Sequence, residues 1–168
     1  MKQKVIGGDF DATRYISSRV FAPSRDGKQI PLSIVHKKEL KKDGSNPTLI
    51  YAYGDYGDNI NTYFEQEVIS LLDRGFIYVV ANVRGGSEMG QQWYEDGKML
   101  NKKNTFYDFI DVTNFLISNN SAIFHVAMQS SRLYFRIQAS LFDLRLLIST
   151  DLFHCLHQSN ALAPLLPL

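Results

Sequence analysis

A loop rich in tyrosine, aspartate and glycine holds the side chains best suited to chemistry in this sequence. It reads YAYGDYGDN over residues 51–59 and follows a short apolar run, so Tyr53 lies just past the end of a predicted buried strand. In open α/β sheets ligands bind at that end of the strands, where a hydroxyl donor can stabilise a developing negative charge. The same hydroxyl could instead pack and cap the loop. The residues alone leave both roles open for Tyr53.

The serines include no recognisable nucleophile. Ser87 follows two glycines but is not in a G-x-S-x-G sequence, the pattern that places a nucleophilic serine on a strained turn between a strand and a helix. Ser130 and Ser131 have no glycine near them, because none follows Gly97. We therefore expect neither a nucleophile nor its partner base in these residues.

Three histidines and the only cysteine lie late in the sequence. Zinc could bind His125, His154, Cys155 and His157, but their spacing matches no strong zinc pattern. We expect no metal and no cofactor, with a zinc site as a minor alternative.

Composition excludes several classes of protein. The 168 residues are 45% hydrophobic and 21% charged, as expected for a soluble domain with a core. A formal net charge of +1, without long blocks of like charge, favours neither nucleic acid nor an anionic membrane as a partner. The start lacks the apolar core of a secretory signal, and no stretch approaches the roughly 20 apolar residues that span a bilayer. With one cysteine and no possible intrachain disulfide, we expect a cytoplasmic protein.

Alternating strands and helices must position the tyrosine loop. The predicted strands, which are rich in β-branched, aromatic and other apolar residues, are 14–21, 30–37, 48–54 and 76–83. The first two flank Asp26-Gly27, a strong turn signal, and so predict a β-hairpin. Residues 62–74 have apolar residues at helical spacing and precede Gly75, which suits a helix end.

A second helix is predicted after a long loop. Residues 84–98 are expected to form that loop, with Arg84 and Glu88 paired across a turn. Thr105 and Asp108 have the spacing of a capping box, which predicts a helix from Thr105 to about Ile117. This order of elements indicates an α/β architecture with an antiparallel start and a mainly parallel sheet.

Composition changes abruptly near residue 118. From Ser118 to Leu168 there is no glycine, lysine or glutamate, although an α/β domain needs glycine at its tight turns. We interpret residues 118–168 as an anomalous tail that arose from a shifted reading frame or a truncated gene. The alternative is a helical appendage over SSRLYFRIQASLFDLRLLIS.

Three long runs occur in an order and spacing that resemble a known family. They are GSNPTLIYAYGDYG, SLLDRGFIYVVANVRGGSEMGQQWYEDGK and KKNTFYDFIDVTNFLI. They resemble the peptidase domain of the prolyl oligopeptidase family of serine peptidases, and within it the oligopeptidase B (protease II) branch. The resemblance covers about residues 3–117 and implies a partial α/β-hydrolase fold. Residues 1–13 would be the propeller-to-peptidase junction and residues 14–117 the N-terminal half of the peptidase domain.

The resemblance also implies roles for site residues. In this family a tyrosine hydroxyl of the Tyr-Gly-Tyr-Gly-type loop helps to build the oxyanion hole, and Tyr53 is the matching position. Asp55 and Asp58 are weak candidates for binding basic peptides, whereas Tyr51 and Tyr56 are expected to pack. The family usually has a third glycine where Ser87 stands.

The family's nucleophile, aspartate and histidine lie in segments that the resemblance does not reach. The family hydrolyses short peptides, in the oligopeptidase B branch after Arg or Lys. We therefore expect a truncated serine oligopeptidase that is inactive alone, because the Ser-Asp-His triad is absent. The alternative is a non-catalytic interaction module that complements a separately encoded C-terminal fragment.

Overall fold

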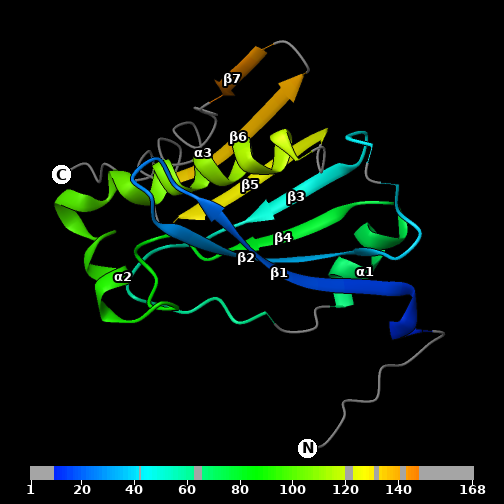
Figure 1. The fold of residues 1–168 in the computed structure, drawn as a ribbon, viewed down its shortest axis with the longest axis horizontal. Helices are drawn as coiled ribbons and strands as arrows, with labels where there is room; N and C mark the ends of the chain where they lie inside the picture. Colours follow the sequence, from blue (N-terminus) through cyan, green and yellow to red (C-terminus); the bar gives the residue numbers. More distant parts are fainter. Residues whose placement is uncertain are drawn as a thin grey trace, which may run out of the picture.

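A computed structural model describes residues 10–41, 43–62 and 66–119 in full, and the backbone of strands within 123–147. In these ranges the chain forms a seven-stranded sheet with the order β1-β2-β4-β3-β5-β6-β7 (Figure 1). The strands are β1 Tyr15–Pro23, β2 Gln29–Lys37, β3 Pro47–Tyr51, β4 Ile77–Ala81, β5 Ile123–Ser130, β6 Leu133–Ser140 and β7 Asp143–Leu147. The helices are α1 Gln66–Asp73, α2 Gln91–Glu95 and α3 Lys103–Ser118, with short 3-10 turns at Ala12–Arg14 and Met99–Asn101.

The first two strands form the predicted hairpin. They pair antiparallel from Tyr15 opposite Lys37 to Pro23 opposite Gln29. The turn between them is closed by the amide of Ser24, which donates to the Lys28 carbonyl at 2.9 Å. Gly27 has a φ of +80°, a conformation that glycine adopts without steric cost, so the prediction of a turn at this position is confirmed.

The middle of the sheet is parallel. β3 pairs with β4 on one side and with β5 on the other, both in parallel, while β2 joins β4 antiparallel. The predicted antiparallel start and parallel centre are therefore confirmed. Because β3 and β4 run in the same direction, the loops that follow them leave the same edge of the sheet. The tyrosine loop and the loop after β4 are thus brought together.

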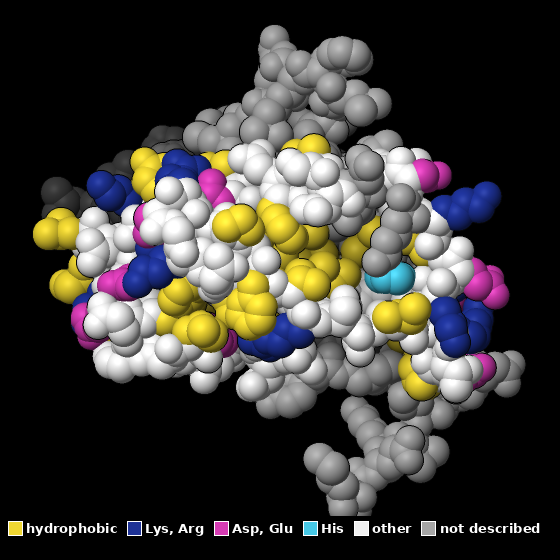
Figure 2. Space-filling view, in the orientation of Figure 1, with side chains coloured by type: hydrophobic (Ala, Val, Ile, Leu, Met, Phe, Trp, Pro, Cys, Tyr) yellow, Lys and Arg dark blue, Asp and Glu magenta, His cyan; other side chains and the backbone are white. Residues whose placement is uncertain are grey.

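The two faces of the sheet have different coverings. Alternate residues of β4, Ile77 and Val79, are buried in the main core with Phe109 and Val112 of α3. Each such apolar side chain contributes on the order of 1.5–3 kcal/mol when it is fully buried. The intervening β4 residues instead line a cavity of about 620 Å³ on the other face, beneath α1. Figure 2 shows hydrophobic side chains across the middle of one side of the molecule, with most charged groups toward its two ends.

The predicted loop 84–98 contains a short helix, α2, that the sequence pattern does not indicate. α2 is only one turn long, too short to show a periodic pattern, and it is held by a tertiary contact. The buried Trp93 indole donates from Nε1 to the carbonyl of Asn82 at 3.1 Å. This contact with the end of β4, and not the helical propensity of its own residues, therefore holds the single turn in position.

The capping box predicted at Thr105 is wrong. α3 begins at Lys103, and the hydroxyl of Thr105 donates to the carbonyl of Arg84 at 2.6 Å. Asp108 binds Arg84 instead of the first turn of the helix. Both side chains have the spacing of a capping box, but they form hydrogen bonds with Arg84 and not with the first turn of the helix.

The helical alternative for the late residues is also wrong. β6 and β7 are antiparallel strands that extend the sheet beyond β5. The sequence FRIQAS within β6 alternates apolar and polar residues, a period of two that favours a strand. Residues 148–168, including His154, Cys155 and His157, lie outside the described residues. No helix in the described ranges has the length and apolar character required to cross a bilayer.

Candidate active site

The candidate site lies where the chain leaves β3 and β4. Tyr53 follows β3 by two residues and is partly buried, and its hydroxyl forms no hydrogen bond with any described residue. Partial burial raises the pKa of Tyr53, and the carboxylates of Asp58 and Asp55 raise it further. A tyrosine hydroxyl is protonated at neutral pH in any case, and this shift reinforces the form that can donate a hydrogen bond to an anion.

Hydrogen bonds tie the tyrosine loop to the loop after β4. The amide of Gly57 donates to the carbonyl of Gly85 at 2.9 Å. Ser87 donates from its hydroxyl to the Gly57 carbonyl at 2.5 Å and contacts Asn59 Oδ1 at 2.9 Å. Ser87 therefore joins the two loops and is not placed as a nucleophile.

Two glycines let the loops approach this closely. Gly54 has a φ of +66°, and a Cβ there would lie 2.7 Å from Cγ2 of Val83. A Cβ on Gly85, whose φ is +104°, would overlap the carbonyl of Gly54. Any other residue at either position would separate the loops and strain the backbone.

The two acidic candidates have different surroundings. Asp55 forms an ion pair with Lys102, and its side chain is only 11% exposed. Lys102 also donates to the Gly54 carbonyl at 2.5 Å. Asp58, in contrast, is exposed. The structure brings both carboxylates near Tyr53, but Asp58 is the more accessible to a ligand.

The prediction that Tyr56 packs is wrong. Its side chain is 70% exposed and its φ is +56°, a left-handed conformation that is uncommon for a residue other than glycine. The turn between Gly54 and Gly57 imposes this conformation and directs the ring outward. Tyr51, at the end of β3, is partly buried and lines the cavity beneath α1.

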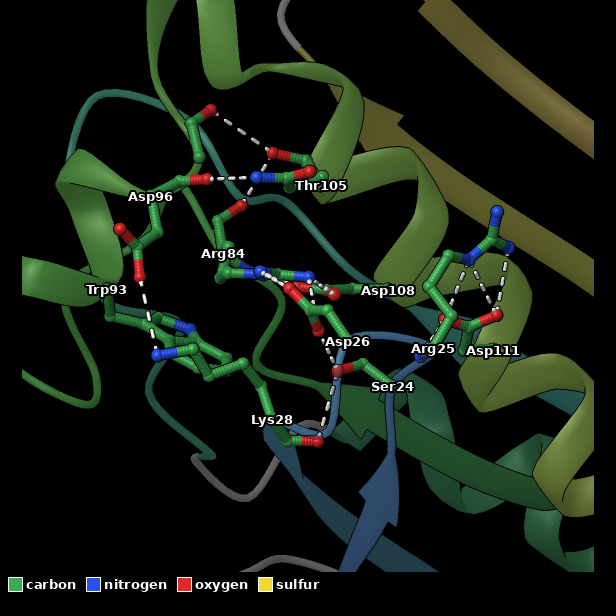
Figure 3. A network of polar contacts seen from close by, with 12 residues as sticks. Ser24, Arg25, Asp26, Lys28, Arg84, Trp93, Asp96, Thr105, Asp108 and Asp111 are labelled. Carbon is green, nitrogen blue, oxygen red and sulfur yellow. Dashed lines mark hydrogen bonds and ion pairs between the residues drawn. The ribbon is translucent and has the colours of Figure 1, made fainter.

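A buried arginine network lies in the loop after β4 (Figure 3). The Arg84 side chain is 3% exposed and binds Asp108 of α3 through Nε at 2.8 Å and Nη2 at 2.5 Å. Its Nη1 binds Asp26 of the hairpin turn at 2.5 Å. The predicted Arg84–Glu88 pair is therefore wrong. Arg84 instead joins three segments that are distant in the sequence.

Asp26 and Arg84 are held in their charged forms in this network, whereas burial raises the pKa of Asp108 against the hydrogen bonds from Arg84. Burial alone would favour the neutral form of Asp26, but hydrogen bonds from Ser24 and Arg84 outweigh it and lower the Asp26 pKa to about 2. The two aspartates raise the pKa of Arg84 above its already high ordinary value. Asp26 is thus a carboxylate throughout the neutral range.

Glu88 was not identified from the sequence as a site residue. Its Oε1 accepts hydrogen bonds from the amide of Ile60 and from Asn82 Nδ2, both at 3.0 Å. Its Oε2 is buried and has no hydrogen-bond partner among the described residues. Neither Glu88 nor Lys102 has a local sequence signal, because their partners are distant or lie in loops. In the described ranges, no three histidine, cysteine, aspartate or glutamate side chains gather as a metal site would require.

Comparisons with known proteins find similarity to one family of peptidases. A family model described as Prolyl oligopeptidase family matches residues 62–126. The chain is 50% identical over 123 residues to dipeptidyl aminopeptidase BI from Pseudoxanthomonas mexicana, covering 73% of this chain and 17% of that protein. It is 41% identical over 115 residues to protease 2 from Moraxella lacunata, covering 68% of this chain and 17% of the relative.

The fold resembles solved structures of the same kind. Oligopeptidase B from Leishmania major has a TM-score of 0.72 and 39% sequence identity, over 76% of this chain and 18% of that one. The chain thus spans about 17% of the length of the curated relatives named above. It carries a partial version of the α/β fold of these peptidases.

Proposed function

Because the chain carries part of the peptidase domain of the prolyl oligopeptidase family, we propose that it supplies the oxyanion-binding side of a serine oligopeptidase site. Residues 14–117 would form the N-terminal half of that domain, and residues 1–13 the junction before it. The reaction would be the family's hydrolysis of short peptides. The names of the two curated relatives, an aminopeptidase and a protease, support a peptide substrate.

The observation that carries this proposal is the environment of the Tyr53 hydroxyl. It lies beyond the carboxyl end of a parallel strand, stays protonated, and has no acceptor among the described residues. In acyl transfer a tetrahedral intermediate places negative charge on the former carbonyl oxygen. A donor fixed at that point stabilises the charge without reorganising during the reaction.

The remaining steps need groups that these 168 residues do not provide in a recognisable form. No G-x-S-x-G sequence occurs in them, and without a nucleophilic serine and its base no acyl-enzyme can form. We propose that this chain is inactive by itself. A separately encoded segment that carries the triad would complement it. In that alternative the chain is a non-catalytic interaction module.

Substrate preference is proposed from the acidic side chains of the tyrosine loop. Asp58 is exposed and carries the negative charge that a basic peptide side chain would meet. Cleavage after Arg or Lys, as in the oligopeptidase B branch, is the specificity that we propose. Asp55 is a weaker candidate, because Lys102 already compensates its charge.

The experiment is hydrolysis of a fluorogenic Arg-Arg peptide by the purified chain, with and without the product of the adjacent downstream reading frame. Activity in the mixture only would support a split peptidase. Tyr53→Phe should then lower kcat by about 100- to 1,000-fold, the cost of removing one oxyanion donor. Equal activity of the Tyr53→Phe mixture would contradict the role of the hydroxyl.

A further inference from the structure

We propose that Lys102 and Asp55 form a positioning pair that holds Tyr53 in place, an inference that rests on the proposed function. Lys102 Nζ makes two contacts within the tyrosine loop. It donates to the carbonyl of Gly54, the residue directly after Tyr53, at 2.5 Å, and it forms an ion pair with the carboxylate of Asp55. The ammonium group therefore binds the two residues that immediately follow the tyrosine.

Lys102 can hold the loop because its own backbone is fixed. It is the residue that precedes α3, whose Phe109 and Val112 are fully or almost fully buried in the core. The next turn is anchored by the Thr105 hydroxyl, which donates to the Arg84 carbonyl. A rigid helix thus presents the lysine, and the lysine in turn fixes a glycine-containing loop that has no regular secondary structure of its own.

The pair also solves an electrostatic problem at the site. The Asp55 carboxylate is close enough to Tyr53 to raise its pKa, so it would also repel negative charge that develops beside the hydroxyl. Lys102 compensates that charge with an ammonium group of opposite sign. Asp55 can therefore help to fix the loop without opposing an oxyanion.

This arrangement assigns Asp55 a role different from substrate binding. A basic substrate side chain would have to displace Lys102 from a carboxylate that is almost buried. The exposed Asp58 meets no such competition from Lys102. The acidic residues of the loop thus divide into one that positions Tyr53 and one that can contact a ligand.

The first test uses this chain alone and is independent of peptidase activity. The protein is labelled with 3-fluorotyrosine, and the Tyr53 resonance is assigned from its loss in Tyr53→Phe. Lys102→Met and Asp55→Asn should each shift or broaden that resonance. Amide exchange at Gly57 should become at least about tenfold faster, because each variant removes a charge-assisted contact that fixes the loop. Lys103→Met, a change at the exposed neighbouring lysine, should alter neither readout.

An unchanged Tyr53 resonance and unchanged Gly57 exchange in both Lys102→Met and Asp55→Asn would overturn the proposal. Circular dichroism of each variant shows whether the fold is retained. If Lys102→Met unfolds the chain, Asp55→Asn decides the outcome, because it removes the pair without removing the lysine stem.

The second test is a double-mutant cycle in the active mixture with the complementing segment. Lys102→Met should lower kcat about tenfold or more with little change in KM. In the Tyr53→Phe background the same substitution should cause no further loss of kcat. An equal loss in both backgrounds would contradict action through Tyr53. If no mixture is active, the proposed function fails, whereas the spectroscopic result still decides whether the pair positions the tyrosine.

Discussion

Arg84 and Asp108 form a two-point hydrogen-bonded ion pair across 24 residues of sequence, and both side chains are almost completely shielded from water. The backbone amide of Arg84 donates to the same carboxylate at 3.0 Å. The pair joins the loop after β4 to α3. This loop contacts the tyrosine loop, and α3 begins directly after Lys102.

Asp108→Asn should strongly destabilise the fold. It leaves the buried Arg84 charge with only the partly exposed Asp26 as a partner, and breaking a buried ion pair costs about 3–5 kcal/mol. Urea unfolding followed by circular dichroism measures the change. Glu95→Gln, which removes a partly exposed pair with Lys98, is the control and should leave the midpoint almost unchanged. Similar midpoints for both variants would contradict the importance assigned to the buried pair.

Asp26 should make folding stability depend on pH in the acidic range. Its pKa falls from 3.8 to about 2 on folding, so its contribution is complete above about pH 4 and is lost as the pH falls through 2. Its side chain is 43% exposed, so solvent screening limits the effect to about 1 kcal/mol.

The Asp26 contribution is measured as a difference between proteins. Wild type and Asp26→Asn are unfolded in urea at several pH values from 2 to 6. The stability advantage of the wild type should grow as the pH rises from 2 to 4 and then stay constant. A difference that did not vary with pH would show that the carboxylate gains nothing from Arg84.

Gly54→Ala should lower the free energy of unfolding more than Gly75→Ala does. Both glycines have positive φ, so alanine pays about 1–2 kcal/mol for the backbone conformation at either position. A Cβ at Gly75 meets open space, whereas one at Gly54 collides with Val83 and Thr105, which adds about 1–3 kcal/mol. Thermal unfolding of the two variants tests this order. Equal melting temperatures would mean that the loops separate easily.

Ser87→Gly should loosen the tyrosine loop locally. It removes the hydroxyl that contacts Gly57 and Asn59, and each such hydrogen bond contributes about 0.5–1.5 kcal/mol. Hydrogen exchange should accelerate at residues 57–60. Ser45→Gly, at an exposed turn, is the control and should leave that exchange unchanged. Unaltered exchange in Ser87→Gly would show that the Gly57–Gly85 bond is sufficient.

The hairpin, the parallel centre and α3 could be predicted from the sequence because their signals are local. Asp26-Gly27 marks the hairpin turn, and the uncharged run at 76–83 marks the central strand. The predicted boundaries differ from the observed ones by a few residues. α2 could not be predicted, because a single helical turn is too short to show a periodic pattern of apolar residues.

The site could be predicted only in part. The position of Tyr53 after a buried strand was apparent, and the placement of that strand in a parallel sheet is confirmed. The partners of Arg84, Glu88 and Lys102 could not be inferred, because each contact depends on how distant segments meet. Thr105 and Asp108 even gave a misleading local signal, since their spacing fits a cap that they do not form.

Trp93 is the only tryptophan in the 168 residues, and it lies against the loop that contacts the tyrosine loop. Its own carbonyl accepts the amide of Gly85 at 3.1 Å, while its indole is nearly buried. The chain therefore contains an intrinsic fluorophore at its candidate site. Its emission wavelength should therefore report the docking of these two loops without any label.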